Sequence, residues 1–173
     1  AAASSRLKLP PLGMKTVAKQ AYSMEQPVAS APLADKIALV KEAYAAAIGH
    51  DARVKKAVVT LGDELQYVTI ANSEGLVISD ARPQVRLVAR VTAEENGKRN
   101  SANGNAGGRV GMAFYQTSGS TPREIGIKAA TEAVILLGAT DPTPGDQPVV
   151  LGAANSGVVI HEAVGHPLEG DSN

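Results

Sequence analysis

The spacing of apolar residues changes from a helical period to a strand period near residue 50 of this 173-residue chain. Before that point, apolar side chains recur every three or four positions and form one stripe of a helix between Pro32 and Gly49: Leu33, Ile37, Val40, Tyr44 and Ile48. From about residue 53 to residue 115 the period falls to two, which is typical of strands with one buried face. The pattern therefore predicts a helix followed by a sheet.

Turn sequences divide this second region into short strands. We expect turns at three segments that combine Gly with Asn, Asp or Glu: residues 62–64, 72–75 and 96–97. The clearest strand covers residues 84–92, where small and branched apolar residues alternate with Arg, Val and Thr, and the alternation returns over residues 110–114. Because short connections join consecutive strands, the sheet should be an antiparallel meander of four or five strands.

The second half of the chain returns to a helical period. Thr121 to Glu124 has the sequence of a capping box with Pro at the first helical position, and it predicts a helix that runs to Gly138. After a proline-rich loop we expect a short buried strand over residues 149–151 and a third helix from residue 158 to about 166. The predicted fold class is α+β, a mainly antiparallel sheet with flanking helices, in the order α-β-β-β-β-(β)-α-β-α.

The same pattern suggests three parts. Residues 1–32, rich in Pro, Ala and Ser, should form an extended or irregular N-terminal arm. Residues 33–147 should form the α+β antiparallel-sheet domain. Residues 148–173 should form the third part, a strand plus a helix.

Composition and charge argue against several classes of partner. The 17 Lys and Arg balance the 17 Asp and Glu, and only five residues are aromatic, so we expect no nucleic-acid partner. No stretch approaches the roughly 20 apolar residues that span a bilayer, so we expect no membrane partner. Cysteine is absent, which fits a reducing compartment and predicts a cytoplasmic protein.

Two of the three histidines lie within six residues, His161-Glu162-Ala163-Val164-Gly165-His166. Imidazole is a common metal ligand, and helical zinc peptidases place a glutamate beside a ligand histidine as the general base for a metal-bound water. On a regular α-helix, residues five apart point about 140° apart, so both rings can face one ion only across a π-bulge. We predict such a bulge between His161 and His166, and Gly165 fits it because it keeps a side chain out of a crowded turn.

A solvated acidic turn is the plainer interpretation of this segment. A metal site is favoured because the carboxylates Glu162, Glu169 and Asp171 surround the histidines, with no Lys or Arg from residue 145 to residue 173. The isolated His50 is instead interpreted as a packed or surface histidine.

The glycine-rich residues 101–111 also have two interpretations. One is a mobile hairpin loop that needs glycine for positive φ. The other is a flat edge where a substrate backbone pairs as an added strand. The flanking Lys98, Arg99 and Arg109 would then either hold a substrate carboxylate or form a solvated rim.

The string HEAVGHPLEGD at residues 161–171 resembles the signature of the TldD/PmbA family of zinc metallopeptidases, and specifically its TldD-type subunit with an HExxxH motif. Similar strings upstream (DARPQVRLVARV, EENGKR, NGNAGGRVG) extend the resemblance over about residues 30–173. It implies an intracellular enzyme that hydrolyses small or unfolded peptides, with a TldE/PmbA-like partner subunit or as a homo-oligomer. It also implies one Zn²⁺ held by His161 and His166, with Glu162 as the general base.

One feature departs from the family pattern. There the third protein ligand is a cysteine in a downstream domain, whereas this sequence has no cysteine and ends at Asn173. We therefore expect an N-terminal or central fragment that binds zinc weakly or not at all and is inactive alone, unless the fold brings Glu169, Asp171 or His50 to the ion. The alternative is a non-catalytic scaffold that binds a partner subunit, with structural histidines.

Overall fold

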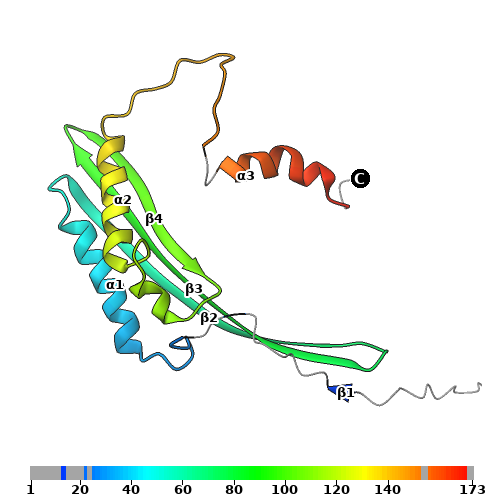
Figure 1. The fold of residues 1–173 in the computed structure, drawn as a ribbon. Helices are drawn as coiled ribbons and strands as arrows, with labels where there is room; N and C mark the ends of the chain where they lie inside the picture. Colours follow the sequence, from blue (N-terminus) through cyan, green and yellow to red (C-terminus); the bar gives the residue numbers. More distant parts are fainter. Residues whose placement is uncertain (1–12, 15–21, 23–24, 153–155, 171–173) are drawn as a thin grey trace, which may run out of the picture. The chain divides into compact units, whose positions relative to one another are not determined.

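The computed structural model describes residues 13–14, 22, 25–152 and 156–170 (Figure 1). It divides into two compact units, Ala1–Ala139 and Thr140–Asn173. In the first unit, helices α1 (Leu33–Ile48) and α2 (Pro122–Leu136) lie on one face of an antiparallel sheet. The expected α+β class with an antiparallel sheet and flanking helices is therefore confirmed.

The sheet is built around one long central strand. Strand β3 (Leu76–Glu95) pairs antiparallel with β2 (Val54–Ala71) over its length and with β4 (Lys98–Gly108) over its second half. A two-residue strand, β1 (Gly13–Met14), pairs in parallel with the start of β3. The described residues thus contain three antiparallel strands and the short β1, rather than the predicted meander of four or five.

The predicted turn at residues 62–64 is wrong, because these residues continue β2. Gly62, Asp63 and Glu64 stand in unbroken register opposite residues 84–86 of β3. The Asp63 carboxylate also accepts a hydrogen bond from the Lys36 ammonium of α1 at 2.8 Å. Pairing on one side and an ion pair to the helix favour the extended backbone over a local turn signal.

The strand predicted over residues 84–92 is longer than expected, since β3 begins at Leu76 and passes through Pro83 without interruption. Within the described residues, β1 pairs with β3 only up to Val77, and β4 pairs with it only from Val85. Between these points, the part of the chain that the structure describes gives β3 a neighbour on the β2 side alone. A strand with one open side tolerates proline, because no ladder bond is lost there.

The hairpin predicted at residues 96–97 is confirmed and joins β3 to β4. Asn96 and Gly97 both have positive φ, 50° and 78°, as a two-residue type I′ turn requires. The turn at residues 72–75 is confirmed as well: the Asn72 side chain accepts hydrogen bonds from the backbone of Glu74 and Leu76, and Gly75 has φ 86°.

The glycine-rich segment that follows is a regular strand, not a mobile loop, up to residue 108. No glycine of residues 101–111 has positive φ. Gly104 instead permits close packing, since a Cβ built there would lie 2.2 Å from the Ile125 carbonyl oxygen of α2. The strand alternation predicted over residues 110–114 is wrong: residues 112–116 form a 3₁₀-helix, and the Met112 N–H donates to the Gln26 carbonyl oxygen at 2.9 Å.

The core consists of apolar side chains of β3 packed against mostly small side chains of the two helices. Its buried members include Val85, Leu87, Ala89, Val91 and Ala93 of β3, Ala43 and Ala47 of α1, Ile125, Ala129, Ala130 and Ala133 of α2, and Val28 from the segment before α1. The packed face of α1 thus differs from the predicted stripe, because Leu33, Ile37 and Tyr44 are 71%, 43% and 48% exposed.

Close packing of α1 against α2 explains this difference. A Cβ built on Gly126 would lie 2.3 Å from the Ala43 carbonyl oxygen, so the two backbones nearly touch. Only glycine at position 126 permits that distance, and side chains larger than alanine on the facing side of α1 would hold the helices apart. The small residues therefore select the buried face of α1.

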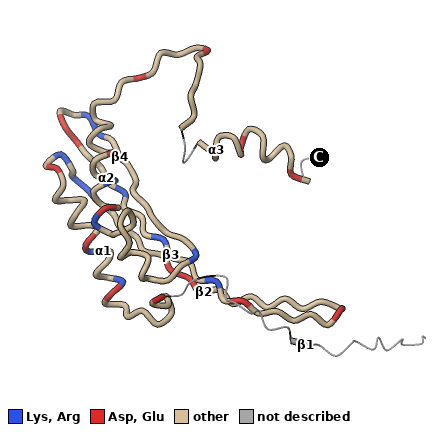
Figure 2. Tube along the Cα trace, viewed as in Figure 1, with Lys and Arg blue, Asp and Glu red and all other residues tan. Residues whose placement is uncertain are grey.

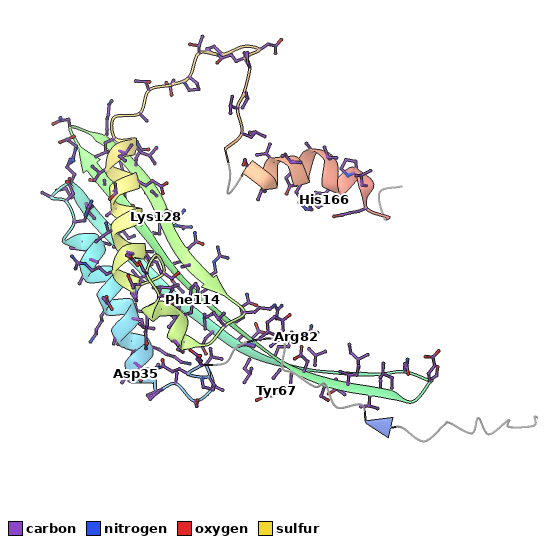
Figure 3. All side chains as sticks on the ribbon, in the orientation of Figure 1. Asp35, Tyr67, Arg82, Phe114, Lys128 and His166 are labelled. Carbon is purple, nitrogen blue, oxygen red and sulfur yellow. The ribbon has the colours of Figure 1, made fainter. Side chains whose placement is uncertain are left out.

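Beyond the helices, β2 and β3 continue as a two-stranded ribbon (Figure 1). Its side chains are mostly exposed on β2, where Tyr67 is 77% exposed (Figure 3), and mostly half-buried on β3. The Arg82 guanidinium donates to the Asp80 carboxylate at 3.0 Å, and the Thr69 and Ser79 hydroxyls are 2.9 Å apart across the strands. These polar contacts supplement the backbone ladder where little core is available.

The strand predicted over residues 149–151 is wrong. Val149, Val150 and Leu151 have no regular secondary structure and are 76%, 96% and 49% exposed. A strand forms only against a partner, and no described residue pairs with them.

Among the helices that the structure describes, none is long and apolar enough to cross a bilayer.

We predict that Gly126→Ala destabilises the first unit by about 1–3 kcal/mol, because the new methyl group meets backbone rather than a movable side chain. Urea unfolding followed by circular dichroism measures this change. Gly62→Ala is the matched control: a Cβ at Gly62 has no atom within 4 Å, so its effect should stay within about 0.5 kcal/mol. Equal effects of the two variants would contradict the packing argument.

The N-terminus of α2 yields a prediction about pH. Hydrogen bonds from the Thr121 hydroxyl and backbone, and from the Gly119 N–H, hold the pKa of Glu124 below its usual value. A lowered pKa in the folded state stabilises the protein above the unfolded-state pKa of about 4.3, and this contribution disappears as the pH falls through the folded-state value.

The stability difference between the wild type and Glu124→Gln should therefore shrink as the pH falls below about 4. Urea unfolding across this pH range tests it. Glu132→Gln removes the same charge from an exposed position on α2 and controls for general electrostatics. A constant difference between wild type and Glu124→Gln at every pH would refute the linkage.

Candidate metal centre

The predicted bulge lies where the two histidines require it. The C-terminal helix begins as α3 (Ser156–Ile160), widens into a π-helical turn, η2 (His161–Gly165), and ends in a 3₁₀ turn, η3 (His166–Leu168). The His166 N–H donates to the His161 carbonyl oxygen, five residues back. This i→i+5 bond brings residues of HExxxH spacing to the same side of the helix.

The two imidazole rings therefore lie side by side. Their centroids are 4.6 Å apart, with an angle of 56° between the ring planes. Among the described residues, one group of side chains offers ligand atoms that all lie within 4.8 Å of one another: His161, His166 and Glu169. Figure 3 labels His166 on this helix.

Two carboxylates lie against the His166 ring. Glu169 Oε2 is 3.0 Å from Nδ1, and Glu162 Oε2 is 3.3 Å from Nε2. Glu169 follows His166 by three positions, and its backbone N–H also donates to the His166 carbonyl oxygen at 3.0 Å. Carboxylates thus contact both nitrogens of one imidazole.

Gly165 makes room for the other ring. A Cβ built on Gly165 would lie 2.6 Å from His161 Nδ1, closer than any normal contact. The backbone of Gly165 is helical, with φ −63°, so space rather than backbone freedom requires glycine there. The sequence indicated a crowded turn. In the structure, the group that crowds it is the ring of His161, one of the two candidate ligands.

The local charge is entirely negative. All 17 Lys and Arg lie at or before Lys128, and six acidic residues follow it in the sequence (Figure 2). The site is also open to solvent: the side chains of His166, Glu162 and Glu169 are 50%, 62% and 45% exposed. Such a segment attracts a cation, and two nitrogen donors with a carboxylate match the ligand types that zinc binds.

The other sequence candidates lie elsewhere. His50 belongs to the first unit, where its Nε2 is 2.9 Å from the Thr131 hydroxyl. Asp171 falls outside the described residues. Arg99 pairs with Glu94 at 3.1 Å, and the Arg109 guanidinium lies 5.7 Å from the centre of the Tyr22 ring.

Sequence reasoning missed the contact between Glu169 and His166. It considered Glu169 as one of the surrounding carboxylates and as a substitute metal ligand. The spacing contained a usable signal, because residues three apart are neighbours on a helical turn.

Comparison with known proteins identifies a family and several relatives that this chain resembles. Residues 26–137 match the family described as the PmbA/TldA metallopeptidase central domain. The chain is 37% identical over 155 residues to a protein named "Metalloprotease TldD homolog" from Haemophilus influenzae, covering 88% of this chain and 32% of that protein. A protein of the same name from Buchnera aphidicola (subsp. Acyrthosiphon pisum) is 30% identical over 167 residues, covering 94% of this chain and 34% of that protein.

Solved structures share the fold at lower identity. A Thermotoga maritima protein described as a candidate modulator of a DNA gyrase aligns with a TM-score of 0.63 and 22% identity, over 81% of this chain and 31% of that one. A similar protein from Bacteroides thetaiotaomicron gives a TM-score of 0.57 and 22% identity, over 70% of this chain and 26% of that one. The chain thus spans about a third of its curated relatives, and the structural matches concern the fold alone.

We predict that Gly165→Ala lowers zinc affinity on the order of tenfold, because the methyl group displaces the His161 ring. Titration against a chelating zinc indicator measures the affinity. Gly157→Ala, in the same helix with no atom near a new Cβ, should bind zinc like the wild type. Unchanged affinity in Gly165→Ala would show that the position of the His161 ring does not matter for binding.

Proposed function

Because this chain belongs to the PmbA/TldD metallopeptidase family, we propose that it supplies the metal-binding helix of a zinc-dependent peptidase. The observation that carries the proposal is the π-helical turn, which sets the rings of His161 and His166 side by side with Glu162 between them in sequence. The relatives are named metalloproteases, which fits a site of this donor type.

In this proposal His161 and His166 hold the ion and Glu162 is the general base. A zinc ion bound there would supply Lewis acidity toward the carbonyl of the bond to be cleaved. Glu162 Oε2 takes the proton of the attacking water and passes it to the leaving amine. The short distance from Glu162 Oε2 to His166 Nε2, 3.3 Å, places the base beside the ligand nitrogen.

The exposure of these side chains supports an extended peptide as the substrate. Their carboxylate and imidazole groups are about half open, so a flexible chain reaches them without first entering a closed cavity. We accordingly propose small or unfolded peptides as substrates, and a TldE/PmbA-like subunit or a second copy of this protein as partner, in the cytoplasm.

Residues 148–173 would then begin the catalytic domain, and residues 33–147 would form the sheet domain before it. A catalytic zinc site ordinarily has three protein ligands and a water. Two histidines leave the third position to another residue, so the isolated chain should bind zinc weakly and lack activity.

We expect Glu162→Gln in the full-length protein to retain zinc and to lose peptide hydrolysis by about 10²–10⁴-fold, because the amide cannot accept the proton. His166→Ala should instead release the metal. Elemental analysis and a fluorogenic peptide assay, with and without chelator, separate the two effects.

Glu132→Gln, on the exposed face of α2, controls for loss of a carboxylate elsewhere and should keep both properties. Full peptidase activity in Glu162→Gln would eliminate the assigned base. Chelator-resistant activity in the wild type would instead favour a scaffold whose histidines are structural.

A further inference from the structure

The His166 ring is held from both sides by carboxylates of its own helix. Nδ1 lies 3.0 Å from Glu169 Oε2, and Nε2 lies 3.3 Å from Glu162 Oε2. Only one of the two distances falls within the usual range of a hydrogen bond from nitrogen to oxygen, about 2.7–3.2 Å. The two carboxylates therefore have different relations to the ring.

The contact with Glu169 favours one of the two ring tautomers of His166. An ionised carboxylate only accepts hydrogen bonds, so a bond between it and Nδ1 requires the N–H on Nδ1. A neutral imidazole has one N–H, and its other nitrogen then carries the free electron pair. In His166 that nitrogen is Nε2, the one beside Glu162.

Local backbone structure holds Glu169 in place. The 3₁₀ turn η3 closes with the Glu169 N–H donating to the His166 carbonyl oxygen at 3.0 Å, so the same two residues are joined by backbone and by side chain. Two linked contacts restrict the glutamate more than one, and they restrict the ring rotation of His166 as well.

We propose that Glu169 is a positioning residue for the metal centre: it fixes the Nδ1–H tautomer and the orientation of His166, so that Nε2 binds the ion. This inference rests on the proposed function. In this arrangement the Glu169 carboxylate accepts the hydrogen bond from Nδ1–H. Glu169 is therefore a partner of the ligand His166 and not itself a ligand of the ion. Carboxylate partners of ligand histidines commonly have this effect on tautomer and basicity.

The test compares Glu169→Ala with Glu169→Gln in the full-length protein. The glutamine amide oxygen still accepts a hydrogen bond from Nδ1, whereas alanine leaves that N–H without its partner. Zinc affinity, measured by competition with a chelating indicator, should fall roughly 10–100-fold in Glu169→Ala and recover most of that loss in Glu169→Gln. Glu132→Gln, at an exposed position on α2, is the control and should bind zinc like the wild type.

Cobalt substitution provides a second readout that does not depend on activity. Because Glu169 is outside the ligand set, the visible absorption bands of Co²⁺ should keep their positions in both Glu169 variants once saturated. If Glu169 were instead a metal ligand, the Co²⁺ bands would shift in both variants, and Glu169→Gln would bind zinc as weakly as Glu169→Ala.

The outcomes distinguish this inference from the proposed function. Wild-type affinity in both Glu169 variants, or the ligand pattern just described, overturns the positioning role while the zinc site stands. A full-length wild type that binds neither Zn²⁺ nor Co²⁺ overturns the proposed function, and the positioning role with it.

Discussion

Backbone pairing along β3 is the constraint on which the first unit depends. This strand has β2 beside it over its whole length and β4 beside its second half, and it contributes five residues with at most 1% exposure. The helices pack on the face that these residues form. Two local preferences in the region, the turn signal at residues 62–64 and the proline at residue 83, yield to that pairing.

Small residues then set the distance between layers. Gly126 allows α2 to approach α1, and Gly104 allows it to approach β4, in each case to within contact of backbone atoms. Dispersion contacts over such closely packed backbones compensate for a core with few aromatic side chains. The same principle operates in the second unit, where Gly165 admits the ring of His161.

The candidate site depends on contacts of short range within one helix. His161, Glu162, His166 and Glu169 all belong to nine consecutive residues, and their contacts join residues three, four or five positions apart. This is why the bulge and the two ligand candidates could be predicted from sequence: the requirement that both rings face one ion fixes the backbone geometry. Which nitrogen of His166 faces Glu169 could not be predicted, because it depends on a side-chain rotamer.

Local interactions determined four features directly from the sequence, since each follows from residues near one another along the chain. These are the α+β class, the capping box at Thr121, the type I′ turn at Asn96-Gly97 and the π-turn at His161. Only the tertiary structure decided three others: the continuity of β2 and β3, the buried face of α1 and the strand at residues 98–108. In these cases the local signal favoured a turn, another helix face or a loop. Partners distant in sequence supplied the hydrogen bonds and close packing that outweighed it.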